Sequence, residues 1–237
     1  SAMDWSKCFR FSRGSCRATA EMQPEAGLVV MARWPGSGRC KRRLAKDLAE
    51  QLGLSASAER SARLQRQLCS HTLNVARQEQ DWGRISPVLA ISGLGPRAAR
   101  RWGRQQGIQR IRRQGKGGLG VLLKRQLLQE RHWRRPTLVI GTDLPDLSHH
   151  DLHDALTRLK RCDLVLGPAA DGGYWLIGFS RRLMSDPERW PLIGIPWGDA
   201  TVCRRTLEAA QVGGCSTALL QHRCDIDHLQ DLKPWLG

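Results

Sequence analysis

The stretch that most constrains the fold of this chain is TLVIGTDLPDL, residues 137–147. Residues 138–141 form a short apolar run that ends in glycine, which is typical of a strand buried on both faces of a sheet. Asp143 and Asp146 follow this run, with Pro145 between them to end the strand pairing. Open α/β sheets bind ligands at the carboxyl ends of their strands, so Asp143 is placed to hold a divalent cation.

The same two aspartates have a second interpretation, as caps of a helix that begins near Ser148. Carboxylates at a helix start accept hydrogen bonds from free backbone N–H groups and favour the positive end of the helix dipole. The stretch supports a metal aspartate and a helix cap about equally, so both interpretations stay open here.

Short apolar runs alternate with segments of helical spacing along the chain. The expected strands are residues 26–32, 86–91, 107–112, 138–141, 163–166, 175–178, 192–197 and 217–220, and a terminal helix is expected from His228. This alternation predicts a single α/β domain with a mainly parallel sheet and helices on both faces. The domain is expected to span residues 27–237. Residues 1–26 are interpreted as an N-terminal extension that begins with a tag scar of two or three residues.

The first expected strand runs into a loop rich in glycine and arginine, RWPGSGRCKRR, at residues 33–43. A strand, such a loop and a basic helix start together favour phosphate binding. Glycine lets the backbone approach the anion closely, and N–H groups at the helix start face it. The loop contains neither a Walker A sequence nor GxGxxG. The candidate nucleotide-binding residues are Arg33, Pro35, Gly36, Gly38, Lys41 and Arg43.

Two further acidic groups come from the second half of the chain. Asp171 belongs to the DGGY sequence between two apolar runs, which is either a hairpin turn or a substrate loop whose carboxylate accepts hydrogen bonds from hydroxyls. Asp225 and Asp227 follow the last expected strand. They either cap the terminal helix or complete a metal site with Asp143.

The charge of the chain suggests anionic partners, because the net charge is +16 over 237 residues. Arginine is densest at residues 97–113, where a solvated helix face is favoured over a nucleic-acid patch, since no zinc finger or aromatic RNA platform is present. The eight cysteines form no CxxC pair and are expected to be reduced thiols. His149 and His153 have the i, i+4 spacing of a metal-binding pair, but no HExxH sequence is present, and a solvated helix face is favoured. No apolar run approaches the ~20 residues of a membrane span, and a cytoplasmic location is expected.

Four motifs in order resemble a known bacterial family. They are VVMARWPGSGRCKRRLA (29–45), LVIGTDLPDL (138–147), DLVLGPAADGGYWLIG (163–178) and GIPWGDATV (194–202). The family consists of small glycosyltransferase-like proteins, formerly a domain of unknown function, that are similar to nucleotide-diphospho-sugar transferases; some are assigned to arsenosugar biosynthesis. The resemblance covers about residues 27–235. The wider superfamily includes nucleotidyltransferases that build molybdenum cofactor dinucleotides, the deazaflavin cofactor and isoprenoid precursors.

The resemblance implies a GT-A-like, Rossmann-related fold. It also implies an enzyme that uses Mg²⁺ or Mn²⁺ as a cofactor. Asp143 matches the metal aspartate of the family, and Asp227 lies where related nucleotidyltransferases have a second metal carboxylate. Lys41 and Arg43 would contact phosphate. Asp143 and Asp171 are the implied catalytic residues, with Asp171 orienting an acceptor hydroxyl or acting as base. The sugar or acceptor pocket would be lined by Gly172, Gly173 and Tyr174.

The chain departs from the family pattern at two positions. Arg42 stands where the family usually has threonine, so a hydroxyl is missing. Gly118 stands where a GDLG-type sequence often has an acidic residue, so a role that depends on this carboxylate is in doubt.

Three functions follow as hypotheses. The first is a metal-dependent glycosyltransferase that moves a sugar from a nucleotide-sugar to a small acceptor. The second is a nucleotidyltransferase that uses an NTP and a phosphorylated acceptor and releases pyrophosphate. The third is a basic nucleic-acid- or nucleotide-binding module without catalytic activity, against which the ordered acidic motifs argue.

Overall fold

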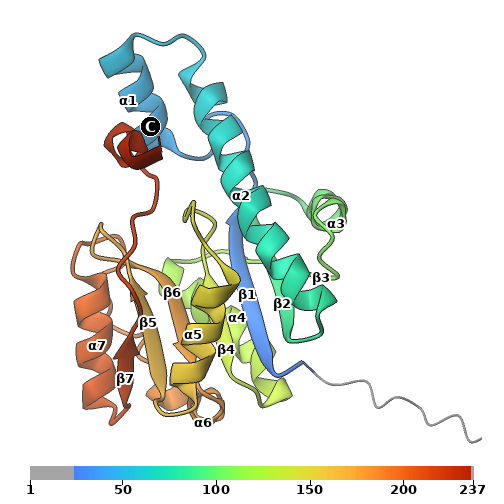
Figure 1. Cartoon of the computed structure of the whole chain (residues 1–237), viewed down its shortest axis with the longest axis vertical. Coiled ribbons are helices and arrows are strands. Elements are labelled where there is room, and N and C mark those ends of the chain that lie inside the picture. The colour runs from blue at the N-terminus through green and yellow to red at the C-terminus, as the bar shows by residue number, and fades with distance from the viewer. Residues whose placement is uncertain (1–23, 236–237) are drawn as a thin grey trace, which may run out of the picture.

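A seven-stranded sheet with strand order β3-β2-β1-β4-β6-β5-β7 forms the centre of the protein (Figure 1). The computed structural model describes residues 24–235, so the predicted N-terminal extension lies outside the described residues except for its last three. The strands are β1 (Ala26–Arg33), β2 (Ile85–Ser92), β3 (Arg110–Arg113), β4 (Thr137–Ile140), β5 (Leu164–Pro168), β6 (Tyr174–Phe179) and β7 (Thr217–Leu219).

Helices separate most of the strands in the sequence. The α-helices are α1 (Arg42–Leu52), α2 (Ser57–Asp81), α3 (Pro96–Gln105), α4 (Leu119–Glu130), α5 (His149–Leu159), α6 (Arg181–Met184) and α7 (Val202–Val212). Three 3₁₀ turns are η1 (Arg131–Trp133), η2 (Pro187–Arg189) and η3 (Leu229–Trp235). The terminal helix expected from His228 is therefore a 3₁₀ turn.

The sheet is mainly parallel, as predicted, and β6 is the exception. It pairs antiparallel with β4 on one side and with β5 on the other. The tight connection at residues 169–173 joins β5 and β6, so the hairpin interpretation of the DGG sequence is confirmed. The parallel pairs β1–β2 and β1–β4 place the carboxyl ends of the three strands at one edge, where α1 and η3 also meet in Figure 1.

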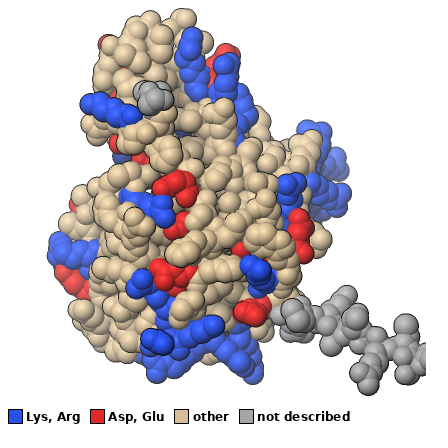
Figure 2. All heavy atoms as spheres, in the orientation of Figure 1, with Lys and Arg blue, Asp and Glu red and all other residues tan. Residues whose placement is uncertain are grey.

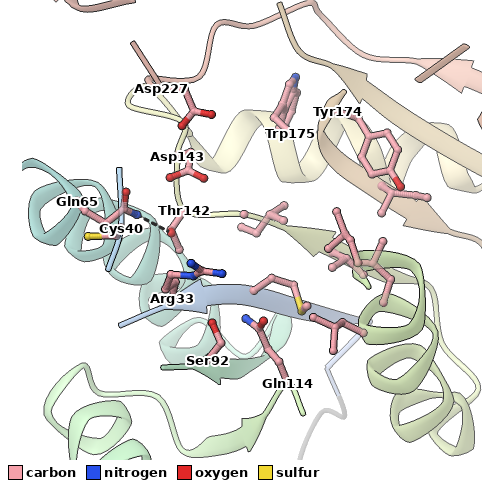
Figure 3. A pocket seen from close by; sticks show the side chains of 18 of the residues that line it. Arg33, Cys40, Gln65, Ser92, Gln114, Thr142, Asp143, Tyr174, Trp175 and Asp227 are labelled. Carbon is pink, nitrogen blue, oxygen red and sulfur yellow. Dashed lines mark hydrogen bonds between the residues drawn. The ribbon is translucent and has the colours of Figure 1, made fainter. Parts of the chain in front are cut away.

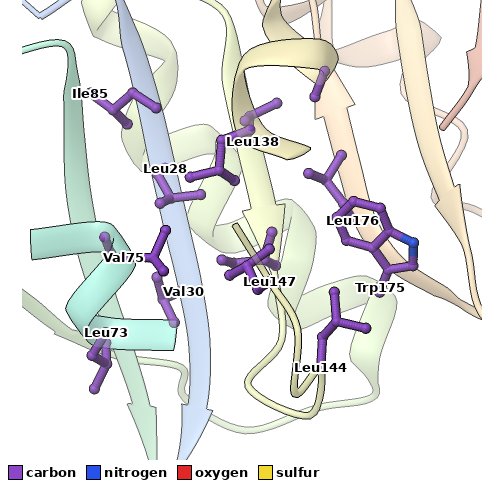
Figure 4. Packing of buried hydrophobic residues seen from close by; sticks show 14 of the residues in the cluster. Leu28, Val30, Leu73, Val75, Ile85, Leu138, Leu144, Leu147, Trp175 and Leu176 are labelled. Atoms are coloured by element: carbon purple, nitrogen blue, oxygen red, sulfur yellow. The ribbon is translucent and has the colours of Figure 1, made fainter. Parts of the chain in front are cut away.

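The two faces of the sheet are covered by different helices, because successive strand residues point to opposite faces. Leu28 and Val30 of β1 pack against α2 and α5, in the cluster of buried side chains that Figure 4 shows. Val29 faces the other side and packs with residues of α4, α6 and α7. Burial on both faces explains why the strands are continuous apolar runs in the sequence.

The predicted strand at residues 192–197 is wrong, since this segment consists of turns and irregular backbone. Pro191 and Pro196 lack the N–H that a strand donates, and Gly194 has a φ of 73°. Leu192 and Ile195 are nevertheless buried, so the apolar pattern reflects packing without sheet pairing.

The expected solvated face of His149 and His153 needs correction. Nδ1 of His149 lies 2.8 Å from Oε1 of Glu79, and Nε2 of His153 lies 3.0 Å from the same oxygen. The Glu79 side chain is fully buried on α2. These histidines therefore join α5 to α2.

The six cysteines within residues 24–235 are free thiols, as predicted. In the same part of the chain, no helix has the length and apolar character needed to cross a membrane.

Candidate active site

The order of the sheet reverses next to β1, because the chain continues to β2 and β3 on one side and to β4 on the other. Such a reversal opens a crevice at the carboxyl ends of the strands. A cavity of about 790 Å³ lies there. Figure 3 shows Asp143 and Asp227 together at one end of it, with Arg33, Ser92 and Gln114 below them.

Lys41 occupies the point where the acidic groups of this cavity meet. Its Nζ lies 2.7 Å from Oδ1 of Asp143 and 2.8 Å from Oδ1 of Asp227. The Lys41 side chain is only 3% exposed, whereas those of Asp143 and Asp227 are 45% and 38% exposed. Burial disfavours the charged form of Lys41, but the two carboxylates outweigh it and raise the Lys41 pKa. The lysine therefore stays an ammonium ion.

The segment that carries Asp227 is fixed by hydrogen bonds to distant parts of the chain. The Ile226 N–H donates to the Asp143 carbonyl over 3.1 Å. The Leu229 N–H and His228 both reach Oδ2 of Asp47 on α1, at 3.1 and 3.0 Å. These contacts bring residue 227 next to residue 143 from the opposite end of the domain.

The loop after β4 is held by its own partners, and the helix-cap interpretation of its two aspartates is wrong. Ser148 is the N-cap of α5, in a reciprocal capping box with Asp151. Asp146 pairs with Arg223 instead, and a second nitrogen of Arg223 lies 2.6 Å from Asp151. Asp143 is thus left to face the cavity.

A second cavity of about 390 Å³ adjoins the first one. Both are lined by Asp143, Arg43, Tyr174 and Trp175, which therefore separate two lobes of one site. The second lobe is closed by the loop at residues 197–200. Trp197 packs edge-on against Tyr174, with 6.3 Å between the ring centroids.

Asp225 is an acidic residue of the second lobe that sequence reasoning weighed only as a cap or metal ligand. Burial, with the neighbouring charges of Asp171, Asp227 and Asp143, raises its pKa to about 6. Four carboxylates therefore gather around the place where the two lobes meet, and they repel one another. The adjacent acidic pair after the last strand was the sequence signal that indicated this position.

Asp171, Gly173 and Tyr174 of the DGGY turn line the second lobe, whereas Gly172 does not. The Gly173 N–H donates to Oδ1 of Asp171 over 2.8 Å, which orders the turn. Gly172 has a φ of 85°, and a Cβ there would lie 1.9 Å from the Ala200 carbonyl oxygen. Glycine is thus required at Gly172 because the turn lies in contact with the loop at residues 197–200.

The predicted nucleotide-binding loop contributes only part of its residues to the cavity. Arg33, Lys41 and Arg43 line it. Pro35, Gly36 and Gly38 lie outside the lining and shape the loop. A Cβ at Gly36 would meet the Trp34 ring at 2.5 Å, and Gly38 has a φ of 70°.

The departure at Gly118 has a structural consequence, because this residue is the N-cap of α4. Glycine has no side chain that could accept a hydrogen bond from the first turn, so α4 begins without a side-chain cap. Gly117 beside it lines the larger cavity.

Gln114 is a cavity residue that sequence reasoning missed. Its Nε2 donates to the carbonyls of Ala32 and Ala90, at 3.1 and 2.9 Å, so the amide is held in one orientation at the carboxyl end of β3. The rule that ligands bind at the carboxyl ends of parallel strands would have indicated it.

The acidic residues suit a hard divalent cation. Among residues 24–235 no group of three or more histidine, cysteine or acidic side chains has the arrangement of a complete metal site. Mg²⁺ and Mn²⁺, however, are commonly held by one or two carboxylates together with phosphate oxygens and water. Asp143 and Asp227 contact the same Nζ atom and supply such a pair. The residues therefore fit a metal that is shared with a phosphate ligand.

Basic side chains also gather away from the site, over α3, as Figure 2 shows. Arg97, Arg100, Arg101 and Arg104 line an open groove on this helix. The groove shares no lining residue with the two acidic lobes.

Comparison with solved structures supports the fold. A protein from Desulfovibrio desulfuricans, provisionally named a nucleotide-diphospho-sugar transferase, is 24% identical with a TM-score of 0.75, over 89% of this chain and 85% of that one. A cytidylyltransferase from Leptospira borgpetersenii is 12% identical with a TM-score of 0.53, over 90% and 85%. The 4-diphosphocytidyl-2C-methyl-D-erythritol synthase of Anaerococcus prevotii is 11% identical with a TM-score of 0.53, over 88% and 95%. At these identities the likeness establishes a GT-A-like fold and no more.

No curated protein matches the sequence. A family model described as "Uncharacterized protein conserved in bacteria (DUF2064)" matches residues 72–199, which is more than half of the chain. This range includes β2 to β6 and the loops that carry Asp143 and Asp171. The family suggested by the four motifs is thereby confirmed, and the chain belongs to the DUF2064 family of bacterial proteins.

Proposed function

We propose that this protein is a metal-dependent glycosyltransferase that moves a sugar from a nucleotide-sugar donor to a small acceptor. The observation that carries the proposal is the ion cluster at the junction of two lobes, in which the buried Lys41 pairs with the partly exposed Asp143 and Asp227. A diphosphate at this junction would have the nucleoside on one side and the sugar and acceptor on the other.

The larger lobe suits the nucleotide part of the donor. Arg33, Lys41 and Arg43 present cationic side chains to it, and cationic donors bind phosphate oxygens more strongly than neutral ones. Arg43 lies with one guanidinium nitrogen 3.8 Å from Asp227 and is 67% exposed, so it can turn toward a ligand. These side chains would stabilise the charge that develops on the leaving diphosphate.

Asp143 and Asp227 would hold Mg²⁺ or Mn²⁺, which supplies further neutralisation of the leaving group when bound. The smaller lobe suits the sugar and the acceptor. Asp171 faces it and would orient an acceptor hydroxyl or take its proton, while Tyr174 and Trp197 form an apolar wall.

A nucleotidyltransferase is the second candidate, because the cytidylyltransferase from Leptospira borgpetersenii shares the fold at a TM-score of 0.53. The cationic side chains of Arg33, Lys41 and Arg43 suit a triphosphate as well as a diphosphate. Such an enzyme would join a nucleoside monophosphate to a phosphorylated acceptor and release pyrophosphate.

Product analysis separates the two reactions. The full chain is incubated with a panel of nucleotide-sugars and NTPs, with and without Mn²⁺, after thermal-shift screening has selected the ligands that bind. A ligand at 100 times its Kd stabilises the protein by about 2.7 kcal/mol, which is readily detected. Metal-dependent release of a nucleoside diphosphate supports glycosyl transfer, and release of pyrophosphate supports nucleotidyl transfer.

One variant tests the assignment in this assay, and a second serves as its control. Asp143→Asn should abolish most of the turnover, whereas Asp154→Asn, in an exposed pair with Arg158 on α5, should leave it unchanged. Turnover by Asp143→Asn within a few-fold of the original chain would overturn the assignment. Absence of turnover together with steeply salt-dependent binding to DNA or RNA would favour the non-enzymatic module.

A further inference from the structure

We propose that the Lys41 ammonium group holds the cation position of the unliganded protein, so that a divalent metal binds tightly only together with a phosphate ligand that draws Lys41 away. This inference concerns the regulation of the site described above and rests on the proposed function for the identity of its ligands. It makes binding of metal and phosphate interdependent.

The first observation is that Lys41 satisfies both candidate metal carboxylates at once. Its Nζ is 2.7 Å from Asp143 and 2.8 Å from Asp227, and both contacts are to Oδ1 atoms. A divalent cation held by Asp143 and Asp227 would therefore compete with Nζ for the same two carboxylates. Two cations cannot share this place, since their repulsion in a partly buried site is strong.

The second observation is that Lys41 is placed there by an unusual backbone conformation. Its φ of 47° and ψ of 44° lie in the left-handed region, which is unfavourable for a residue with a Cβ. The surrounding loop and the two ion pairs must compensate for this strain.

The third observation is that a phosphate ligand can bind within reach of the Lys41 side chain. Lys41 is the N-cap residue of α1 and makes no side-chain cap, so phosphate can bind N–H groups of the first turn. Arg33 and Arg43 line the same cavity and would bind the same anion. The lysine has a flexible stem, so Nζ can move to phosphate oxygens without movement of α1.

Carboxylates on other elements also favour a cation at the position of the Lys41 ammonium group. Asp225 of the C-terminal segment lies close enough to feel the charges of Asp143 and Asp227, and Asp171 of the turn after β5 lines the same lobe as Asp143. A cation at the junction relieves the repulsion between Asp225 and the pair of Asp143 and Asp227. Lys41 supplies that cation before the substrate arrives, and the metal supplies it afterwards.

The test measures Mn²⁺ binding to the nucleotide-free full chain by isothermal titration calorimetry. The original chain is compared with Lys41→Met, which empties the position between the carboxylates, and with Arg43→Met, which removes an equal charge from beside them. We expect Lys41→Met to bind Mn²⁺ at least about tenfold more tightly, and Arg43→Met to bind it only slightly more tightly. Equal affinities for the original chain and Lys41→Met, or equal gains in both variants, would overturn the proposal.

A second measurement needs no variant at Lys41. Inorganic phosphate should tighten Mn²⁺ binding to the original chain, and Mn²⁺ should tighten phosphate binding by the same factor, because coupling is reciprocal. Independent binding of the two would contradict the inference. In Lys41→Met/Asp143→Asn the gain in Mn²⁺ affinity should disappear, which locates the metal. These binding measurements do not depend on turnover, so failure of the glycosyltransferase assay would not affect them. Conversely, if Lys41→Met did not change Mn²⁺ affinity, the inference would fail while the glycosyltransferase assay could still succeed.

Discussion

Carboxylates gather at both ends of the parallel strands, but only at the amino ends are their charges fully matched. Glu130 lies there with no exposed surface and contacts Arg110 at 2.6 Å and Arg112 at 2.7 Å, with Arg135 at 3.6 Å. At the carboxyl ends, Asp143 and Asp227 share one lysine.

Asp163, which precedes β5, shows the same saturation as Glu130. It accepts hydrogen bonds from Arg182 at 2.7 Å and from the N–H and hydroxyl of Ser216, both at 3.0 Å. Burial alone would raise its pKa, but these donors lower it. Asp225 at the other end has a raised pKa because it is buried among like charges.

The comparison shows that burial and acidity do not by themselves distinguish a structural carboxylate from a functional one. Structural carboxylates bring enough arginine and hydrogen-bond donors to satisfy their charge. The functional cluster keeps a surplus of negative charge, and only a ligand or cation from outside can relieve it. This surplus costs stability, and under the proposed function a bound ligand or cation would relieve it.

The largest expected effect is on stability, from Glu130→Gln. This change leaves three arginines without their buried partner and should lower the free energy of unfolding by about 3–5 kcal/mol. Urea denaturation measures it, with Glu208→Gln in an exposed pair on α7 as the control that should change little. If Glu130→Gln lowered the free energy of unfolding only slightly, the carboxylate charge at the amino ends of the strands would be no better balanced than that at the carboxyl ends.

The next effect is on activity, from Asp143→Asn. Loss of leaving-group stabilisation should reduce kcat by about 10²–10³-fold. The free energy of unfolding should change by less than about 1 kcal/mol, since the half-exposed Asp143 leaves Lys41 paired with Asp227. Steady-state kinetics and urea denaturation of the same preparation give both values. A large loss of stability would mean that this aspartate belongs to the structural class.

A smaller effect on stability is expected from Asp163→Asn, about 1.5–3 kcal/mol for the loss of charged hydrogen bonds. The Asp163 pKa is lowered by folding, so its contribution is present above its ordinary value, near pH 4, and is lost as the pH falls through the folded pKa. The difference between the variant and the original chain should therefore shrink in acid. A difference that is constant from pH 7 to pH 3 would contradict the ionic explanation.

The smallest effect is a gain in stability from Asp225→Asn. The Asp225 pKa is raised to about 6 by folding, so its ionised form destabilises the folded state, and this penalty grows between about pH 4 and pH 6 and then stays constant. The variant should be more stable at pH 8 by on the order of 1 kcal/mol once solvent screening is allowed for, and unchanged at pH 4. Asp154→Asn should show no such pH dependence.

Most of the fold could be predicted from local patterns in the sequence. Buried strands appear as apolar runs, and helices appear through the spacing of their leucines, so β1, β4 and α5 were found close to their observed bounds. The strand predicted at residues 192–197 failed because two prolines and Gly194 prevent sheet pairing while Leu192 and Ile195 are still buried. An apolar run indicates that a segment is buried. It does not show whether the segment has the backbone N–H groups that strand pairing requires.

The site was predicted less completely, because its parts come from distant segments. The sequence contains the candidates Asp143, Lys41 and Asp227. The resemblance to the family assigned a metal or phosphate role to each of them. The contact of one lysine with both carboxylates joins residues separated by 186 positions, and nothing local specifies it. The roles of Asp146 and Asp143 also diverge only because Arg223 reaches one of them.

The sequence by itself determined the α/β class, the strands that end at the site and the residue types available there. These depend on local periodicity and chemistry, which the chain carries in any conformation. Tertiary structure alone decided which charges meet, which carboxylates are satisfied and which keep their surplus. The physical reason is that an ion pair and a raised pKa depend on distance and burial, and both are set only when β4, α1 and the C-terminal segment pack together.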